Sequence, residues 1–203
     1  MKLFIVIIIF IFGISSCTYS DKDFNMNETD LSFLNAFKKG DTLCYENSKM
    51  EFEKFLVLGL DSNQKKEYGT LMAKPAFNEF SVNIKHLGKS IFQNSLQKLN
   101  SENFDTIAKP IFIITKYPQN KETSYFFAFN HFYSNKSAGI GELHKDTIIN
   151  KLKIESYYIL RESSIYSSDT SRNEIDLLYW TQKDGMVAYK QKNGTYWTKK
   201  NNH

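Results

Sequence analysis

Alternating apolar and polar positions run through the second half of the chain. Segments 80–84, 111–117, 154–161 and 174–181 place apolar, mostly β-branched or aromatic residues at every second position, which is typical of β-strands. Near the end, Asp184-Gly185 and Asn193-Gly194 lie between strand-like runs and are strong signals for hairpin turns. We therefore predict an α+β, β-rich fold with a mainly antiparallel sheet, a C-terminal β-meander and one or two short helices.

Segment 125–133 is aromatic at most of its positions. As one strand, it would carry four aromatic side chains on one face and two on the other, namely Tyr125, Phe127, Phe129 and Tyr133 against Phe126 and Phe132. A strand that is apolar on both faces is normally covered on both. We predict a single strand that is central in the sheet or lines a cavity.

Segment 42–60 fits two structures. Ser48 and Glu51 imitate a helix capping box, but we prefer a hairpin with strands at 42–46 and 50–60 and a turn at 47–49. In its second strand, Phe52, Leu56 and the apolar positions around them would face the core, and Glu51 and Glu53 would face solvent. The polar residues 61–66 would form a loop.

Two further segments are candidates for helices. Apolar residues at helical spacing make 89–99 the best helix candidate. Segment 31–39 fits a short helix that stops at Lys38-Lys39-Gly40, and it fits a strand equally well.

The N-terminus carries a processing signal. Lys2 precedes the apolar run 3–14, and the small pair Ser15-Ser16 precedes Cys17. The run is shorter than the ~20 residues that span a hydrocarbon core, as in signal peptides. The segment resembles the lipobox of bacterial type II signal peptides, which implies that residues 1–16 are removed and that Cys17 carries a diacylglyceryl group and an acylated amine. The alternatives are an uncleaved anchor or a plain signal peptide with an incidental cysteine.

This resemblance also bears on location. Two or more acyl chains hold a protein stably on a membrane, so we expect a partnership with the membrane through lipid on Cys17. Thr18 favours the outer membrane of the bacterial cell envelope under the sorting rule known for such lipoproteins. Residues 20–24 resemble a surface-export signal, and the surface or periplasmic face stays open. Residues 17–30 are predicted to form a polar tether, and 31–203 a single domain, because the chain is long enough for one core.

Composition excludes some functions. The formal net charge of +4 comes mostly from lysine, and only Arg161 and Arg172 are arginines. Because arginine is the preferred residue for bidentate recognition of phosphates and bases, we expect no nucleic acid partner. With Cys17 lipidated, Cys44 is the only other cysteine, so we expect a buried, unpaired thiol. No motif points to a cofactor.

Candidate sites are few. His131, Glu142 and His144 are a weak candidate trio for zinc, against which we weigh ordinary polar residues on a hairpin. Thr42, Thr106 and Thr147 each follow an aspartate and precede an apolar residue, a form that resembles a bacterial O-glycosylation sequon. We prefer the interpretation that each aspartate lies in a turn and each threonine opens a strand.

As a whole the chain resembles small bacterial lipoproteins without an assigned activity. The resemblance depends on Gly40-Asp41-Thr42-Leu43 and on the closing motifs around Tyr179-Trp180, Gly185-Met186-Val187, Asn193-Gly194 and Trp197. We expect an envelope lipoprotein that acts as a binding or structural module, with an envelope protein or glycan as its partner. The alternatives are a hydrolase of envelope polymers and a carrier of an apolar ligand.

Overall fold

The computed structural model describes residues 21–65, 76–87, 108–118, 122–129, 132–137, 140–162 and 175–200. Two short helices come first, the 3-10 helix η1 (Asp21–Phe24) and α2 (Glu28–Ser32). The strands follow in this order: β1 (Thr42–Asn47), β2 (Phe52–Lys65), β3 (Phe77–His86), β4 (Lys109–Tyr117), β5 (Glu122–Phe129), β6 (Phe132–Ser137), β7 (Leu143–Ile149), β8 (Leu152–Arg161), β9 (Ile175–Thr181), β10 (Gly185–Gln191) and β11 (Tyr196–Lys199).

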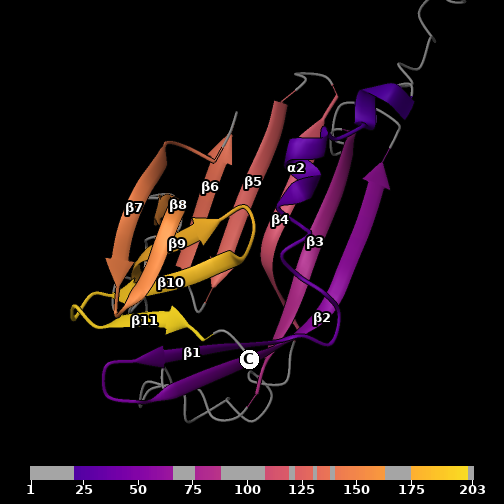
Figure 1. Ribbon diagram of the computed structural model, residues 1–203. Coiled ribbons are helices and arrows are strands. Elements are labelled where there is room, and N and C mark those ends of the chain that lie inside the picture. Colours follow the sequence, from indigo (N-terminus) through magenta and orange to yellow (C-terminus); the bar gives the residue numbers. More distant parts are fainter. Residues whose placement is uncertain are drawn as a thin grey trace, which may run out of the picture.

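All these strands belong to one antiparallel sheet in the order β6-β5-β4-β3-β2-β1-β11-β10-β9-β8-β7 (Figure 1). Strands that are consecutive in the sequence pair with each other, with the exception of β6 and β7, which lie at the two ends of the sheet, and the first strand also pairs with the last. Tyr45 of β1 lies opposite Lys199 of β11, and Asn47 lies opposite Trp197. This pairing joins two meanders, β1–β6 and β7–β11. The β-rich, mainly antiparallel fold and the C-terminal meander are therefore confirmed.

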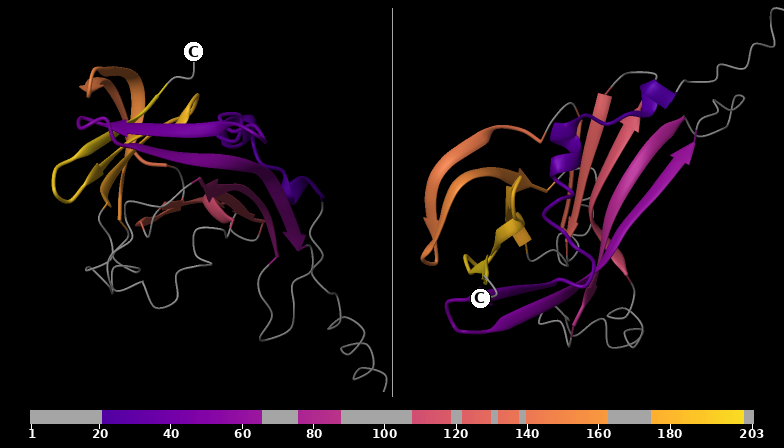
Figure 2. Two further views of the ribbon diagram at one scale, coloured as in Figure 1. Left: turned by 90° about the horizontal axis from the view of Figure 1, so that it is seen from below. Right: turned by 45° about the vertical axis from the view of Figure 1, so that its right-hand side comes forward.

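The sheet curls into a half-barrel, so that its two meanders face each other (Figure 2). The ring of Trp180 on β9 lies 5.2 Å from that of Phe112 on β4 and 4.9 Å from that of Phe127 on β5. Tyr189 on β10 lies 5.2 Å from Phe129 on β5. These rings fill the space between the two halves, and aromatic pairs at such distances add to the energy of burial.

The packed part of the chain begins earlier than predicted. Phe24 is fully buried, and the Asn78 side chain donates to its carbonyl. Asp30 is also buried, where it accepts hydrogen bonds from Tyr125 and Thr123. The prediction that the polar tether extends to residue 30 is therefore wrong at its C-terminal end, because polar neighbours hid one apolar residue and one buried acid.

Segment 31–39 is not a strand. α2 ends at Ser32, and turns follow it. Phe33, Leu34 and Phe37 then pack into the core between the sheet halves, and Phe37 contacts Trp180 at 5.7 Å.

The hairpin β1–β2 confirms the preferred prediction for 42–60. Its turn is closed by Asn47, whose Oδ1 accepts from the backbone N–H groups of Lys49 and Glu51. However, β2 continues to Lys65, so the predicted loop at 61–66 is wrong.

The prediction of which face of β2 is inward is also wrong. Glu53, Phe55 and Val57 are buried, whereas Phe52 and Leu60 are exposed. Tyr45 lies directly opposite Glu53, so these two side chains share the inner face. Apolar residues occur on both faces of β2, and the alternation alone did not distinguish them.

Segment 125–133 forms two strands where one was predicted. β5 and β6 are antiparallel neighbours, with Phe129 opposite Phe132. The reversal puts Phe132 into the core beside Phe129, whereas Tyr133 stacks on Phe126 at 5.9 Å on the other face. The pair lies at one end of the sheet, so the expected central position is wrong as well.

The predicted strands at 80–84, 111–117, 154–161 and 174–181 correspond to β3, β4, β8 and β9. The helix predicted at 89–99 lies outside the described residues. In the part of the chain that is described, no helix combines the length and the apolar character needed to cross a membrane.

The β9–β10 turn provides a test of the core. Gly185 has a φ of +69°, and a Cβ atom there would lie 2.5 Å from Cζ of Phe37. We expect Gly185→Ala to lower the free energy of unfolding by about 2–4 kcal/mol through backbone strain and overpacking, measured by urea denaturation. Gly194, with a φ of +88° and nothing within 4 Å of such an atom, is the matched control, and Gly194→Ala should cost about 1 kcal/mol. Equal losses in the two variants would contradict this packing.

Candidate functional site

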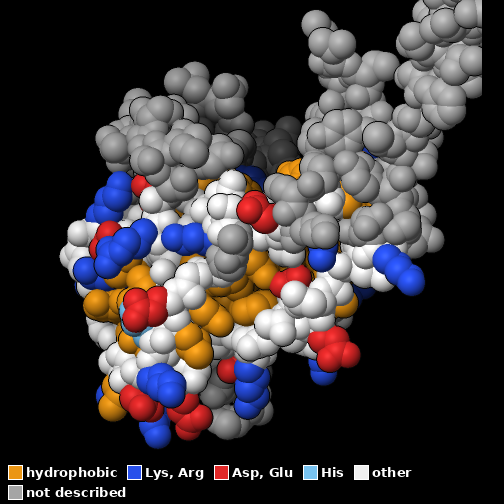
Figure 3. All heavy atoms as spheres, turned by 90° about the horizontal axis from the view of Figure 1, so that it is seen from above, with side chains coloured by type: hydrophobic (Ala, Val, Ile, Leu, Met, Phe, Trp, Pro, Cys, Tyr) orange, Lys and Arg blue, Asp and Glu red, His pale blue; other side chains and the backbone are white. Residues whose placement is uncertain are grey.

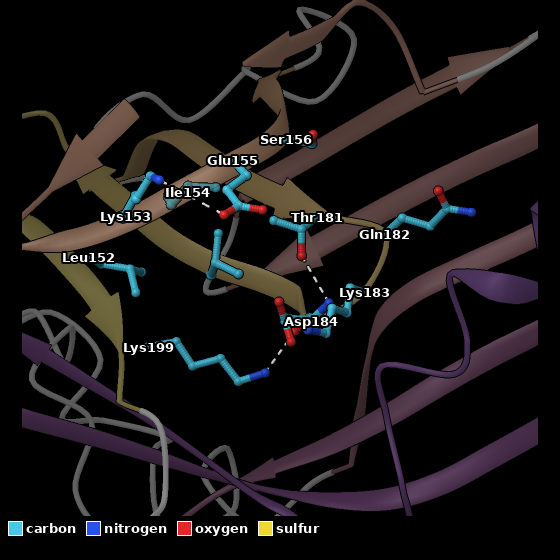
Figure 4. Close-up of a pocket in the computed structure, with 11 residues that line it drawn as sticks. Leu152, Lys153, Ile154, Glu155, Ser156, Thr181, Gln182, Lys183, Asp184 and Lys199 are labelled. Carbon is cyan, nitrogen blue, oxygen red and sulfur yellow. Dashed lines mark hydrogen bonds and ion pairs between the residues drawn. The ribbon is translucent and has the colours of Figure 1, made fainter. Parts of the chain in front are cut away.

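The candidate site is a pocket where two hairpins separate. β8 pairs with β9 only from Tyr158 to Arg161, opposite Leu177 to Trp180. Its first half, from Leu152, pairs with β7 alone and extends beyond the end of β9, where Thr181 turns back to Gly185. The pocket lies between this half of β8 and the β9–β10 turn (Figure 4).

The pocket has a volume of about 640 Å³, which lies in the range of small-ligand sites. One wall consists of five consecutive β8 residues, and the opposite wall consists of the turn and residues of β10 and β11. The lining residues are Leu152, Lys153, Ile154, Glu155, Ser156, Thr181, Gln182, Lys183, Asp184, Val187 and Lys199. Ile154 and Val187 are buried in a small apolar cluster and form the floor.

Several polar groups of the pocket bind one another. The Thr181 hydroxyl accepts from the backbone N–H of Asp184 at 2.9 Å, and Lys199 Nζ donates to the Asp184 carbonyl at 2.7 Å. Across the pocket, Lys153 Nζ lies 3.9 Å from Glu155 Oε1. Both members of this pair are well exposed, at 68% and 80%, so the pair contributes little stability.

Lys199 is the pocket residue with a perturbed titration. Burial lowers the pKa of its ammonium group below the usual 10.5, and the carboxylates of Asp184 and Asp41 partly offset this effect. The side chain is half-buried, and this partial burial disfavours its charged form. An anionic ligand group would restore part of the lost solvation.

The arrangement suits binding better than acid–base catalysis. The pocket contains two carboxylates, Glu155 and Asp184, and both residues are exposed. A general acid at neutral pH normally needs a carboxyl group in an apolar environment. The pocket instead offers charged and hydroxyl groups around an apolar floor.

A buried polar cluster elsewhere escaped the sequence analysis. Tyr189 donates its hydroxyl hydrogen to Glu53 Oε2 at 2.9 Å, and His86 Nε2 lies 3.9 Å from the other carboxylate oxygen. Burial, followed by the charge of Glu53, raises the pKa of Tyr189 well above 10.0. The cluster joins β2, β3 and β10. The only available signal was an acidic residue next to the apolar run of β2.

Two members of the candidate zinc trio lie among the described residues. Glu142 is exposed, and the half-buried His144 ring stacks on Tyr157 at 5.5 Å. His131 lies outside the described residues, among which no cluster of three metal-binding side chains occurs.

The remaining candidates are distributed over the sheet. Thr42 opens β1 after a turn at Asp41, and Thr147 lies in β7 after Asp146, whose φ is +50°. Thr106 and Cys17 lie outside the described residues. Cys44 is buried and unpaired, as predicted.

Aromatic side chains do not form an exposed platform on the described surface. Phe52 is the one described aromatic residue that is exposed by more than a third, at 47%. Seen from above, the molecule does show a strip of apolar side chains with basic groups gathered beside it (Figure 3). The exposed large apolar residues of the described part are Leu31, Met50, Phe52, Leu60, Leu87, Leu143 and Ile148.

No family model matches the chain, and no curated protein or solved structure matches it. The resemblance to small bacterial lipoproteins therefore stays a prediction.

The pocket chemistry can be tested through Lys199. Because its pKa is lower in the folded chain than in the unfolded chain, the unfolded chain binds more protons just below pH 10.5, and the contribution of Lys199 to stability rises with pH there. The free energy of unfolding of the wild type should therefore increase, relative to that of Lys199→Met, as the pH approaches 10.5. Urea denaturation at several pH values measures this difference.

Lys192 is exposed in the β10–β11 turn, so Lys192→Met is the matched control for the loss of a lysine charge. A difference between wild type and Lys199→Met that stays constant or falls with pH would contradict the burial of the amine.

Proposed function

We propose that this chain is a lipid-anchored binding module of the bacterial cell envelope, with the pocket beside β8 as its ligand site. The observation that carries the anchor is the N-terminal sequence, in which Lys2, the apolar run 3–14 and Ser15-Ser16 precede Cys17. Acyl chains on Cys17 would hold the mature chain at the membrane surface. The compact β-rich domain would then present its pocket to other envelope components.

The pocket supports binding over the alternative of a hydrolase. A glycosidase needs two carboxyl groups on either side of the scissile bond, one of them with a raised pKa. Glu155 is 80% exposed and faces Lys153, and Asp184 is an exposed turn residue. Neither carboxyl group is enclosed by apolar side chains.

The carrier alternative depended on a strand with aromatic side chains on both faces. On the inner face, Phe127, Phe129 and Phe132 are at most 3% exposed and belong to the main core cluster, where Phe127 and Phe129 contact other rings. This face is filled by the chain's own side chains in the described region. The motivation for an apolar cargo is therefore removed.

The anchor is tested by replacing each cysteine in turn. We expect Cys17→Ala to abolish incorporation of a radiolabelled fatty acid and to move the protein from the membrane fraction to the soluble fraction of bacteria that process lipoproteins. Cys44→Ala is the matched control and should keep both properties, because Cys44 is buried in the sheet. Membrane retention of Cys17→Ala would contradict the proposal.

A further inference from the structure

We propose that the pocket binds an extended peptide segment of a partner protein, which adds as a strand to the free edge of β8. The proposal rests on the proposed function as a binding module and names its ligand class. It starts from one observation: five consecutive residues, 152–156, line the same pocket. Side chains of a strand alternate between two faces, so the feature that these residues share is a backbone edge.

The register identifies which backbone groups lie at that edge. Asn150 and Lys151 form the two-residue turn between β7 and β8, with φ values of +44° and +70°. Positive φ at both positions defines a type I′ hairpin, in which the flanking residues Ile149 and Leu152 are hydrogen-bonded to each other. Alternate residues of an antiparallel strand direct their N–H and C=O groups to opposite sides. Leu152, Ile154 and Ser156 therefore bond to β7, and Lys153 and Glu155 direct theirs away from it.

On that side β8 has no strand partner before Tyr158 in the described part of the chain. The backbone groups of Lys153 and Glu155 thus face the pocket instead of a neighbouring strand. An unpaired strand edge is a template for another chain. Five strand residues span about 17 Å, so a peptide of about five residues would cover this edge.

Among the described strands, the end strand β7 also has an edge without a strand partner, but this edge offers less. β7 is interrupted at Asp146, whose φ of +50° removes one position from the β7–β8 register. Irregular backbone is a device that protects edges. The β8 edge, in contrast, lies against a second wall formed by the β9–β10 turn and Lys199.

The walls indicate which peptide side chains fit. A peptide residue opposite Ile154 would share its face and lie against the apolar floor with Val187, which favours a β-branched residue there. Lys183 and Lys199 on the opposite wall favour an acidic residue nearby. A glycan fits less well, because no aromatic side chain lines the pocket for stacking against a sugar ring.

The test uses the full mature chain in detergent micelles and a displayed library of peptides of about seven residues. We expect selected peptides to be rich in β-branched and acidic residues and to shift the amide NMR signals of Lys153 and Glu155. N-methylation of a peptide at alternate positions should abolish binding at one register and spare it at the other, because only one set of peptide N–H groups faces β8.

Two variants at one position separate backbone from side-chain recognition. Glu155→Pro removes the edge N–H without removing a bond to β7, and it should weaken binding about tenfold or more, because one hydrogen bond to the peptide is lost and the proline ring adds a clash. Glu155→Ala keeps the N–H, and its affinity should stay within about threefold. Equal weakening in both variants, or binding that tolerates N-methylation at every position, would overturn the proposal.

A panel of charged and neutral polysaccharides, tested in the same way, distinguishes strand addition by a peptide from the more general proposal that the pocket is a ligand site. A polysaccharide that shifts the pocket signals when no peptide does would overturn strand addition and leave the binding module standing. If neither class of ligand shifts these signals, both strand addition and this pocket as the ligand site are wrong.

Discussion

The fold depends on the pairing of its first and last strands. β1 and β11 are adjacent in the sheet, and among the described strands theirs is the only strand pairing between the two meanders. Tyr45 lies at the junction: it is fully buried, donates to the Met186 carbonyl at 2.9 Å and packs against Phe129 and Tyr189 at 6.2 and 5.6 Å. Because Glu46 of β1 and Thr198 of β11 are 152 residues apart, closing this contact costs the entropy of a long loop, and such long-range pairing is typical of slow-folding β proteins.

The same pairing determines where a ligand can bind. It brings the inner faces of both meanders together, and their aromatic side chains fill the space between them. Even Glu53, the acid that enters this space, is held by the Tyr189 hydroxyl, as a buried carboxylate requires. The interior side chains thereby stabilise the fold. The pocket instead lies beyond the end of β9, where β8 has lost one neighbour and β11 supplies Lys199 from the junction itself.

Local patterns in the sequence predicted local structure well. The turns at Asp184-Gly185 and Asn193-Gly194 and the hairpin at 42–60 needed only turn residues and period-two alternation. The errors concern tertiary context. Phe129 and Phe132 were placed on opposite faces because the alternation was read through a chain reversal, and Glu53 was placed in solvent because its burial depends on Tyr189, 136 residues away. The pocket could not be predicted, since it arises from the different lengths of β8 and β9 and not from any motif.

Residue-resolved amide hydrogen exchange on the free chain tests whether pairing of β1 with β11 creates the core and leaves half of β8 with a free edge. We expect slow exchange for the hydrogen-bonded amides of Tyr45–Asn47 and Trp197–Lys199. We expect fast exchange for Lys153 and Glu155, beside slow exchange for Ile154. Uniform protection along β8, or fast exchange throughout the β1–β11 pair, would contradict this arrangement.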